Sequence, residues 1–157
     1  MVSIAGFLGG NRSFNLTVAQ TDCIAISLPT NILRREFARG GELQRILLLY
    51  VRALHCQVSQ NVFCSCHHTL EQRLARWLLF YCDCLEKNQF RLTQETLADL
   101  LGVRRSSLSA VAVDLRQRNL IHYSRGKIVV LNPEALKQVA CKCQLLISRE
   151  YTRLLGS

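Results

Sequence analysis

The stretch that decides the fold lies between residues 93 and 131, and its first part, residues 93–120, reads TQETLADLLGVRRSSLSAVAVDLRQRNL. The pattern predicts a short helix over 93–101 with Thr93 as its N-cap. Its expected inward-facing residues are Leu97, Leu100 and Leu101. Gly102 then supplies a sharp turn, because glycine adopts a positive φ at little cost. A second helix follows over 104–118, so the segment is interpreted as a helix-turn-helix.

The start of the second predicted helix carries side chains suited to contact DNA. They lie largely off the apolar stripe of that helix, as the residues that reach base edges do in a recognition helix; they are Arg104, Arg105, Ser106 and Ser109. Arg105 could pair with a guanine edge through two hydrogen bonds. Thr93 and Gln94 stand at the start of the first helix, where free amides could hold a phosphate.

Residues 121–131 read IHYSRGKIVVL and predict a β-hairpin, since two β-prone runs flank the turn sequence Ser124–Lys127. The hairpin tip carries Arg125 and Lys127, which suits a wing that touches backbone phosphates. A further short strand is predicted over Phe90–Leu92. The whole stretch from 93 to 131 therefore predicts a winged helix-turn-helix.

Upstream, Thr69–Gln72 has the form of a capping box that begins another helix. A longer helix is predicted over 42–63, followed by a break at Cys64–His68. Its apolar seam repeats at spacings of four, three and four residues, through Leu47, Val51, Leu54 and Val58. Such a seam suits either a coiled-coil dimer or a helix packed on its own domain. We favour the dimer, because little of the N-terminal segment is available to cover that face.

Residues 1–30 contain two candidate strands, Phe14–Gln20 and Cys23–Leu28, and a short basic helix is predicted over 30–39. Two strands do not make a stable sheet alone. This segment is therefore expected to be the end of a β-domain whose first part is absent.

The composition bounds the class of protein. The chain has 157 residues and a net charge of +9, which favours an anionic partner such as nucleic acid. No apolar run approaches the roughly 18 residues of a membrane span, and the first 30 residues lack the order of a secretory signal. We therefore predict a cytoplasmic protein without membrane contact, whose eight cysteines are reduced thiols.

One cysteine cluster, Cys64–His68, has residue types that suit zinc or an iron–sulfur cluster. However, Cys-x-Cys is tighter than the common metal-binding spacing. The pairs Cys82/Cys84 and Cys141/Cys143 lie on predicted helices, where residues two apart face different directions. We therefore predict no metal ligand and keep a cysteine-based metal or redox sensor as an alternative. No enzyme is predicted, because nothing beyond a cysteine near His67 or His68 suggests a nucleophile and base.

Residues 69–131 resemble the C-terminal winged helix of the Crp/Fnr family of bacterial regulators. The resemblance is carried by LEQRLARWLL at 70–79, LTQETLADLLGVRR at 92–105 and YSRGK at 123–127. Residues 41–63 are similar to the dimerisation helix of that family, and residues 1–30 to the second half of its cyclic-nucleotide-type β-roll.

The resemblance implies an α+β fold in three parts: the end of a β-roll at 1–40, a dimerisation helix at 41–66 and a winged helix-turn-helix domain at 67–157. It implies a transcriptional regulator that binds a pseudo-palindromic site in double-stranded DNA as a homodimer, with RNA polymerase as a candidate partner. The alternative is a truncated, non-sensing protein that pairs with full-length relatives.

The same resemblance places Arg12 and Ser13 where family members bind the phosphate of an effector nucleotide. The glutamate that would contact the ribose has no counterpart among residues 1–11. We therefore predict no cofactor and do not expect cyclic nucleotide binding.

Overall fold

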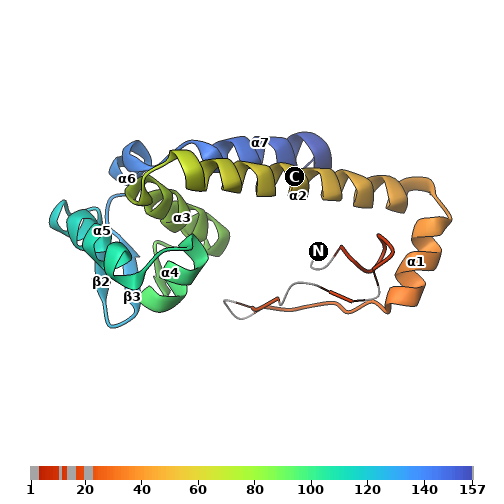
Figure 1. Ribbon diagram of the computed structural model, residues 1–157, viewed down its shortest axis with the longest axis horizontal. Coiled ribbons are helices and arrows are strands. Elements are labelled where there is room, and N and C mark those ends of the chain that lie inside the picture. Colours follow the sequence, from red (N-terminus) through yellow and green to blue (C-terminus); the bar gives the residue numbers. More distant parts are fainter. Residues whose placement is uncertain (1–3, 11, 14–16, 20–22, 157) are drawn as a thin grey trace. The chain divides into compact units, whose positions relative to one another are not determined.

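The computed structural model describes residues 4–10, 12–13, 17–19 and 23–156. Seven helices and three strands follow one another in this part of the chain: α1 (Thr30–Ala38), α2 (Gly41–His67), α3 (Leu70–Leu85), β1 (Gln89–Arg91), α4 (Gln94–Leu101), α5 (Arg105–Gln117), β2 (Ile121–Ser124), β3 (Lys127–Val130), α6 (Pro133–Val139) and α7 (Cys143–Leu155) (Figure 1). The predicted α+β class is confirmed. The chain divides into two compact units, one built from its two ends and one comprising Gln57–Arg149.

The helix-turn-helix forms where the sequence predicts it. Thr93 caps α4, because its hydroxyl accepts a hydrogen bond from the amide of Thr96 at 3.1 Å. Gly102 ends α4 in the left-handed region at φ 64°. The buried face of α4 consists of Leu97, Ala98 and Leu101. Leu100, which was expected to point inward, is instead 44% exposed, because it lies on the flank of that helical face.

The strands form one antiparallel sheet in the order β1-β3-β2, which confirms both the hairpin and the short strand before α4. Phe90 of β1 and Tyr123 of β2 both pair with Ile128 of the central strand. Arg125 and Gly126 join β2 to β3 with positive φ angles of 48° and 73°. Positive φ at both central residues is the signature of a type I′ hairpin turn, whose twist matches that of the flanking strands.

One apolar core holds the unit of residues 57–149 together. Its best-buried side chains come from α3, α4, α5, the sheet and α6, and they include Leu74, Leu78, Leu97, Leu108, Leu115, Ile128 and Leu136. The predicted capping box fixes the start of α3, since Thr69 and Gln72 each accept a hydrogen bond from the other's amide. The core therefore fixes α5 and the hairpin as parts of one body.

Two predicted helix boundaries are wrong. The expected break at Cys64–His68 does not occur there, because α2 continues to His67 and ends only before the Thr69 cap. The helical stretch expected from Ala135 to Leu155 is interrupted: Ala140 is extended at φ −66° and ψ 144°, and α7 begins at Cys143. The amide of Cys141 donates to the carbonyl of Gln72 in α3, at 3.4 Å, instead of continuing the helix. Cys141 therefore lies in a turn.

The described residues before α1 contain no strand. The predicted strand Cys23–Leu28 is wrong: Ile24 and Ile26 are 101% and 97% exposed, and an isolated apolar strand lacks both pairing and cover. The predicted strand Phe14–Gln20 falls mostly outside the described residues, and 17–19 have no regular structure. The basic helix expected at 30–39 is confirmed as α1.

Candidate nucleic-acid interface

The start of α5 is an exposed basic surface on a firmly packed helix. Leu108, Ala112 and Leu115 are buried in the core and fix which side of α5 faces inward. Arg104 caps the helix with an extended backbone and makes no side-chain cap bond. Arg104, Arg105 and Ser106 are all exposed, as expected for side chains that contact a ligand outside the domain. The core thus presents the predicted recognition residues to solvent.

The cations on this surface are not neutralised within the described part of the chain. None of its ion pairs includes Arg104, Arg105, Arg125 or Lys127. Arg118, at the other end of α5, differs, because its guanidinium pairs with both Glu71 and Asp114. The start of α5 and the hairpin tip therefore carry positive charge that is available to an anionic partner.

The start of α5 lies near the hairpin. Burial raises the pKa of the Tyr123 hydroxyl in β2, and the positive charge of Arg105 is close enough to oppose that rise. The Tyr123 hydroxyl donates a hydrogen bond to the carbonyl of Leu92 at 3.0 Å, which holds β2 to the segment that leads into α4. Arg125 and Lys127, both exposed, lie at the tip of this hairpin and add further positive charge.

Two of the predicted contact residues bind each other. The Ser109 hydroxyl of α5 donates to the Gln94 side-chain oxygen of α4 at 2.8 Å. The Thr93 hydroxyl is also engaged, since it lies 2.8 Å from the hydroxyl of Thr96 while it caps α4. Gln94 and Ser109 therefore join the two helices of the motif, whereas Thr93 fixes the start of α4.

The remaining predicted sites lie elsewhere. Arg12 and Ser13 line an open hollow with Thr30, Asn31 and Arg34. The Arg34 guanidinium donates to the carbonyls of Gly6 and Gly10 at 2.6 and 2.5 Å and so shapes one wall of that hollow. Effector binding there stays a prediction.

The four residues of the predicted dimerisation seam on α2 differ in how exposed their side chains are. Leu47 is buried within a single chain, at 7% exposure, and lines a hollow with Leu154 and Leu155. Val51 and Leu54 are half-buried, whereas Val58 is 55% exposed. Other apolar side chains on α2 are also exposed; they are Leu43, Ile46, Leu48, Val62 and Phe63. The exposed apolar side chains of α2 therefore include residues outside the predicted seam.

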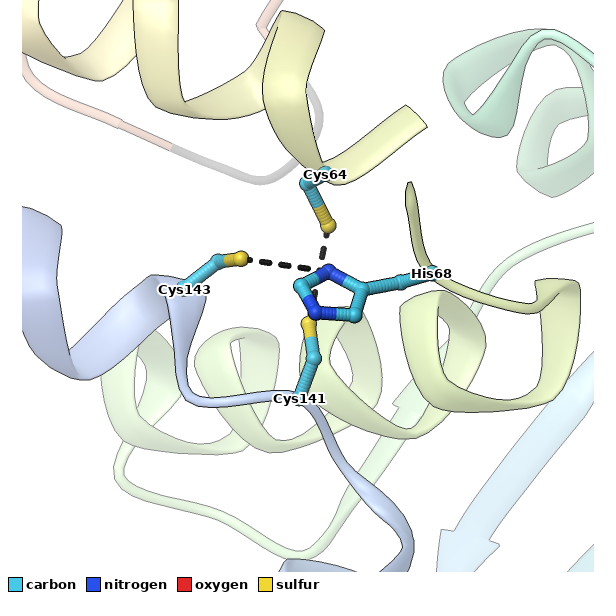
Figure 2. Close-up of side chains that lie close together, drawn as sticks. All are labelled: Cys64, His68, Cys141 and Cys143. Atoms are coloured by element: carbon cyan, nitrogen blue, oxygen red, sulfur yellow. Dashed lines mark hydrogen bonds between the residues drawn. The ribbon is translucent and has the colours of Figure 1, made fainter. Parts of the chain in front are cut away.

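One group of side chains was missed by sequence reasoning. Cys64, His68, Cys141 and Cys143 point toward one another, and their ligand-type atoms all lie within 4.8 Å of one another (Figure 2). Cys66, which the sequence groups with Cys64, is exposed and takes no part. Burial and the neighbouring Cys141 raise the pKa of the Cys64 thiol to about 12. The spacing of four residues between Cys64 and His68 could have indicated this, since it places both on one side of a helical turn.

Known proteins resemble this chain in both sequence and fold. Residues 72–139 match the model of the Crp-like helix-turn-helix domain. The global nitrogen regulator of Synechococcus elongatus is 26% identical over 145 residues, which cover 86% of this chain and 65% of that protein. That of Synechocystis is 24% identical over 144 residues, which cover 86% of this chain and 64% of that protein. This chain thus spans slightly less than two thirds of their length.

A solved structure of a Crp/Fnr-family transcriptional regulator from Eubacterium rectale has a similar fold. Its TM-score is 0.57 at 23% identity, and the match covers 71% of this chain and 51% of that one. These similarities confirm the predicted Crp/Fnr resemblance. No helix in the described part of the chain combines the length and the apolar character that a membrane span requires.

Proposed function

Because this chain contains a Crp-like helix-turn-helix domain at residues 72–139, we propose that it is a sequence-specific DNA-binding regulator of transcription. The start of α5 enters the major groove of double-stranded DNA, and the hairpin turn touches the backbone beside it. Arg105 reads a base edge, whereas Arg125 and Lys127 bind phosphates.

The single observation that carries the proposal is the arrangement of unpaired cations. Arg104 and Arg105 are exposed at the start of a helix that Leu108 and Leu115 anchor in the core, and their charges have no acidic partner among the described residues. Arg118, at the far end of α5, is instead paired with Glu71 and Asp114. Uncompensated cations at the helix start favour an anionic ligand.

The proposed regulator acts as a homodimer. Its two recognition helices would then read half-sites about 34–36 Å apart, one turn of DNA, in a pseudo-palindromic site. The exposed apolar residues of α2, among them Ile46, Val58 and Val62, are the proposed contact surface. A single α2 leaves these side chains in water, and a second copy would cover them.

The experiment is selection from a random duplex library with the purified chain, followed by sequencing of the retained DNA. We expect an enriched motif with two-fold symmetry, whose half-site separation gives the dimer geometry. Arg105→Ala should relax the base preference at one position of each half-site and keep the rest of the motif. The matched control is Lys87→Ala, which removes an exposed cation before β1, at the end of the sheet remote from the hairpin turn. A motif unchanged in Arg105→Ala, or the same relaxed position in Lys87→Ala, would contradict the proposed interface.

A further inference from the structure

Four potential metal ligands meet in the unit of residues 57–149. Cys64 comes from the last turns of α2, His68 follows the end of that helix, Cys141 lies in the turn after α6, and Cys143 begins α7 (Figure 2). The sulfurs of Cys64 and Cys141 are 3.5 Å apart, and the sulfur of Cys143 is 3.4 Å from Nδ1 of His68. The turn that interrupts the predicted final helix is what brings Cys141 to this place.

Apolar packing accounts for buried thiols but not for the imidazole that lies among them. Cys64, Cys141 and Cys143 are 1%, 9% and 2% exposed, yet they form a buried cluster of their own, separate from the main core. The side chain that completes the group, His68, is polar. Three thiols and an imidazole supply little dispersion and apolar area compared with the leucines that fill the neighbouring core.

The spacing fits a single tetrahedral ion. Zinc lies about 2.3 Å from cysteine sulfur and about 2.0–2.1 Å from histidine nitrogen, so tetrahedral ligand atoms lie roughly 3.5–3.8 Å apart. All four ligand atoms here lie within 4.8 Å of one another, and two of the pairs are already at 3.4 and 3.5 Å. An iron–sulfur cluster places several iron and sulfide atoms between its ligands and needs a wider cage.

Two features of the surroundings suit a metal ligand at Cys143. Cys143 is the first residue of α7, where the helix dipole stabilises a negative charge. The Gln60 side-chain amide donates to the Cys143 sulfur at 3.2 Å.

We propose that Cys64, His68, Cys141 and Cys143 bind one Zn²⁺ ion in a closed structural site. Such an ion ties the last turns of α2 to the turn between α6 and α7. The zinc proposal is independent of the DNA-binding proposal, because none of the four ligands belongs to α4, α5 or the hairpin. All four tetrahedral positions are taken by protein ligands, so the site stabilises the fold and does not activate water.

The test is metal analysis of the full chain, purified under reducing conditions after expression with added zinc. We expect one zinc per chain by mass spectrometry of the metal content. Replacement of zinc by Co²⁺ should give the absorption of tetrahedral cobalt together with thiolate-to-cobalt charge-transfer bands. His68→Ala is the first variant, since His68 is only half-buried and its loss leaves the core intact. It and Cys143→Ser should each weaken zinc binding by more than about 100-fold, beyond the effect typical of an outer-shell partner.

The matched control is Cys66→Ser, which removes an exposed thiol two residues from Cys64 on the same helix. It should retain zinc and the cobalt spectrum. Gln60→Ala should lower the zinc affinity by about 10–100-fold while it keeps the same spectrum. Circular dichroism establishes that each variant is folded before its metal is measured.

Several results would overturn the site. One is a folded chain that takes up neither zinc nor cobalt. Equal zinc retention in folded His68→Ala and Cys143→Ser is another, as is equal loss in Cys66→Ser. Iron together with acid-labile sulfide would replace the single ion by a cluster. A Cys64–Cys141 disulfide in a metal-free chain that stays metal-free after reduction would show that the thiols pair instead.

Discussion

The basic surface of the helix-turn-helix and the cysteine–histidine group are built in opposite ways. Arg104, Arg105 and the hairpin turn are exposed, lie close together in the chain, and leave the packing of the core unaffected. The thiols are buried and come from distant chain positions, since Cys64 and Cys141 are 77 positions apart in the sequence. A ligand can therefore be removed from the first region without loss of structure, whereas in the second region the proposed ligand is itself part of the structure.

The difference determines how each region responds to substitution. Changes on the basic surface should alter binding and leave stability nearly unchanged, since exposed positions contribute little to folding. Changes among the thiols should alter stability, because a bound ion stabilises only the folded state. Four predictions test this separation, beginning with the largest expected effect.

Leu108→Ala should reduce both stability and DNA binding. Leu108 is 0% exposed and anchors the recognition helix, so its truncation should lower the free energy of unfolding by about 2–5 kcal/mol. Urea titration measures this, and DNA binding should fall with it. Val113→Ala on the same helix is the control, since Val113 is 42% exposed and its loss should stay within about 0.5 kcal/mol. Equal losses in both variants would show that α5 is not anchored as described.

Removal of zinc should act on stability alone. If free zinc is held at about 100 times its dissociation constant, a chelator should lower the free energy of unfolding by about 2.7 kcal/mol. The melting temperature with and without chelator reports the change. Cys143→Ser should show no chelator effect, while Cys66→Ser should behave as the unaltered chain. A chelator effect that persists in Cys143→Ser would place the stabilising ion elsewhere.

Arg105→Ala should act on base preference alone. Loss of the proposed contact to a base edge should cost about 1–3 kcal/mol at one position of the preferred site. Binding titrations on duplexes that differ at single base pairs measure this, and the melting temperature should be unchanged. An unaltered ranking of the duplexes, with weaker binding to all of them, would make Arg105 a phosphate contact.

Lys127→Ala should have the smallest effect and no sequence dependence. A phosphate contact contributes mostly through counterion release, so its loss should reduce the salt slope of binding by about one and weaken all duplexes alike. Titrations at several salt concentrations give the slope. If only some sequences lose affinity, then the hairpin turn reads bases or groove shape and the assignment of Lys127 is wrong.

The sequence predicts the basic surface well because its determinants are local. Gly102 at φ 64° and the turn at Arg125 and Gly126 are encoded within a few residues, and so is the capping of α4 by Thr93. Helical periodicity identifies Leu108 and Leu115 as the buried stripe of α5. It assigns Leu100 wrongly, because an apolar residue on the flank of a helix follows nearly the same spacing as one on its buried face.

The cysteine–histidine group was not predicted because its determinants are tertiary. Sequence spacing placed Cys141 and Cys143 on one helix, where they would diverge, whereas the extended Ala140 turns the chain and brings both inward. The hydrogen bond from Cys141 to Gln72 that fixes this turn joins residues far apart in the chain. Likewise, the burial of Leu47 depends on packing within the chain, and the periodicity of α2 alone cannot reveal it.

The hydrogen bond between Gln94 and Ser109 also affects how the binding preference of this protein could be redesigned. A longer side chain in place of Ser109 could contact a base. The same substitution would remove the only described side-chain partner of Gln94, so the Gln94 amide could adopt another rotamer. The effects of substitutions at positions 94 and 109 on base preference are therefore coupled. Libraries that vary residues 94 and 109 together should yield altered specificities that scanning either position alone would miss.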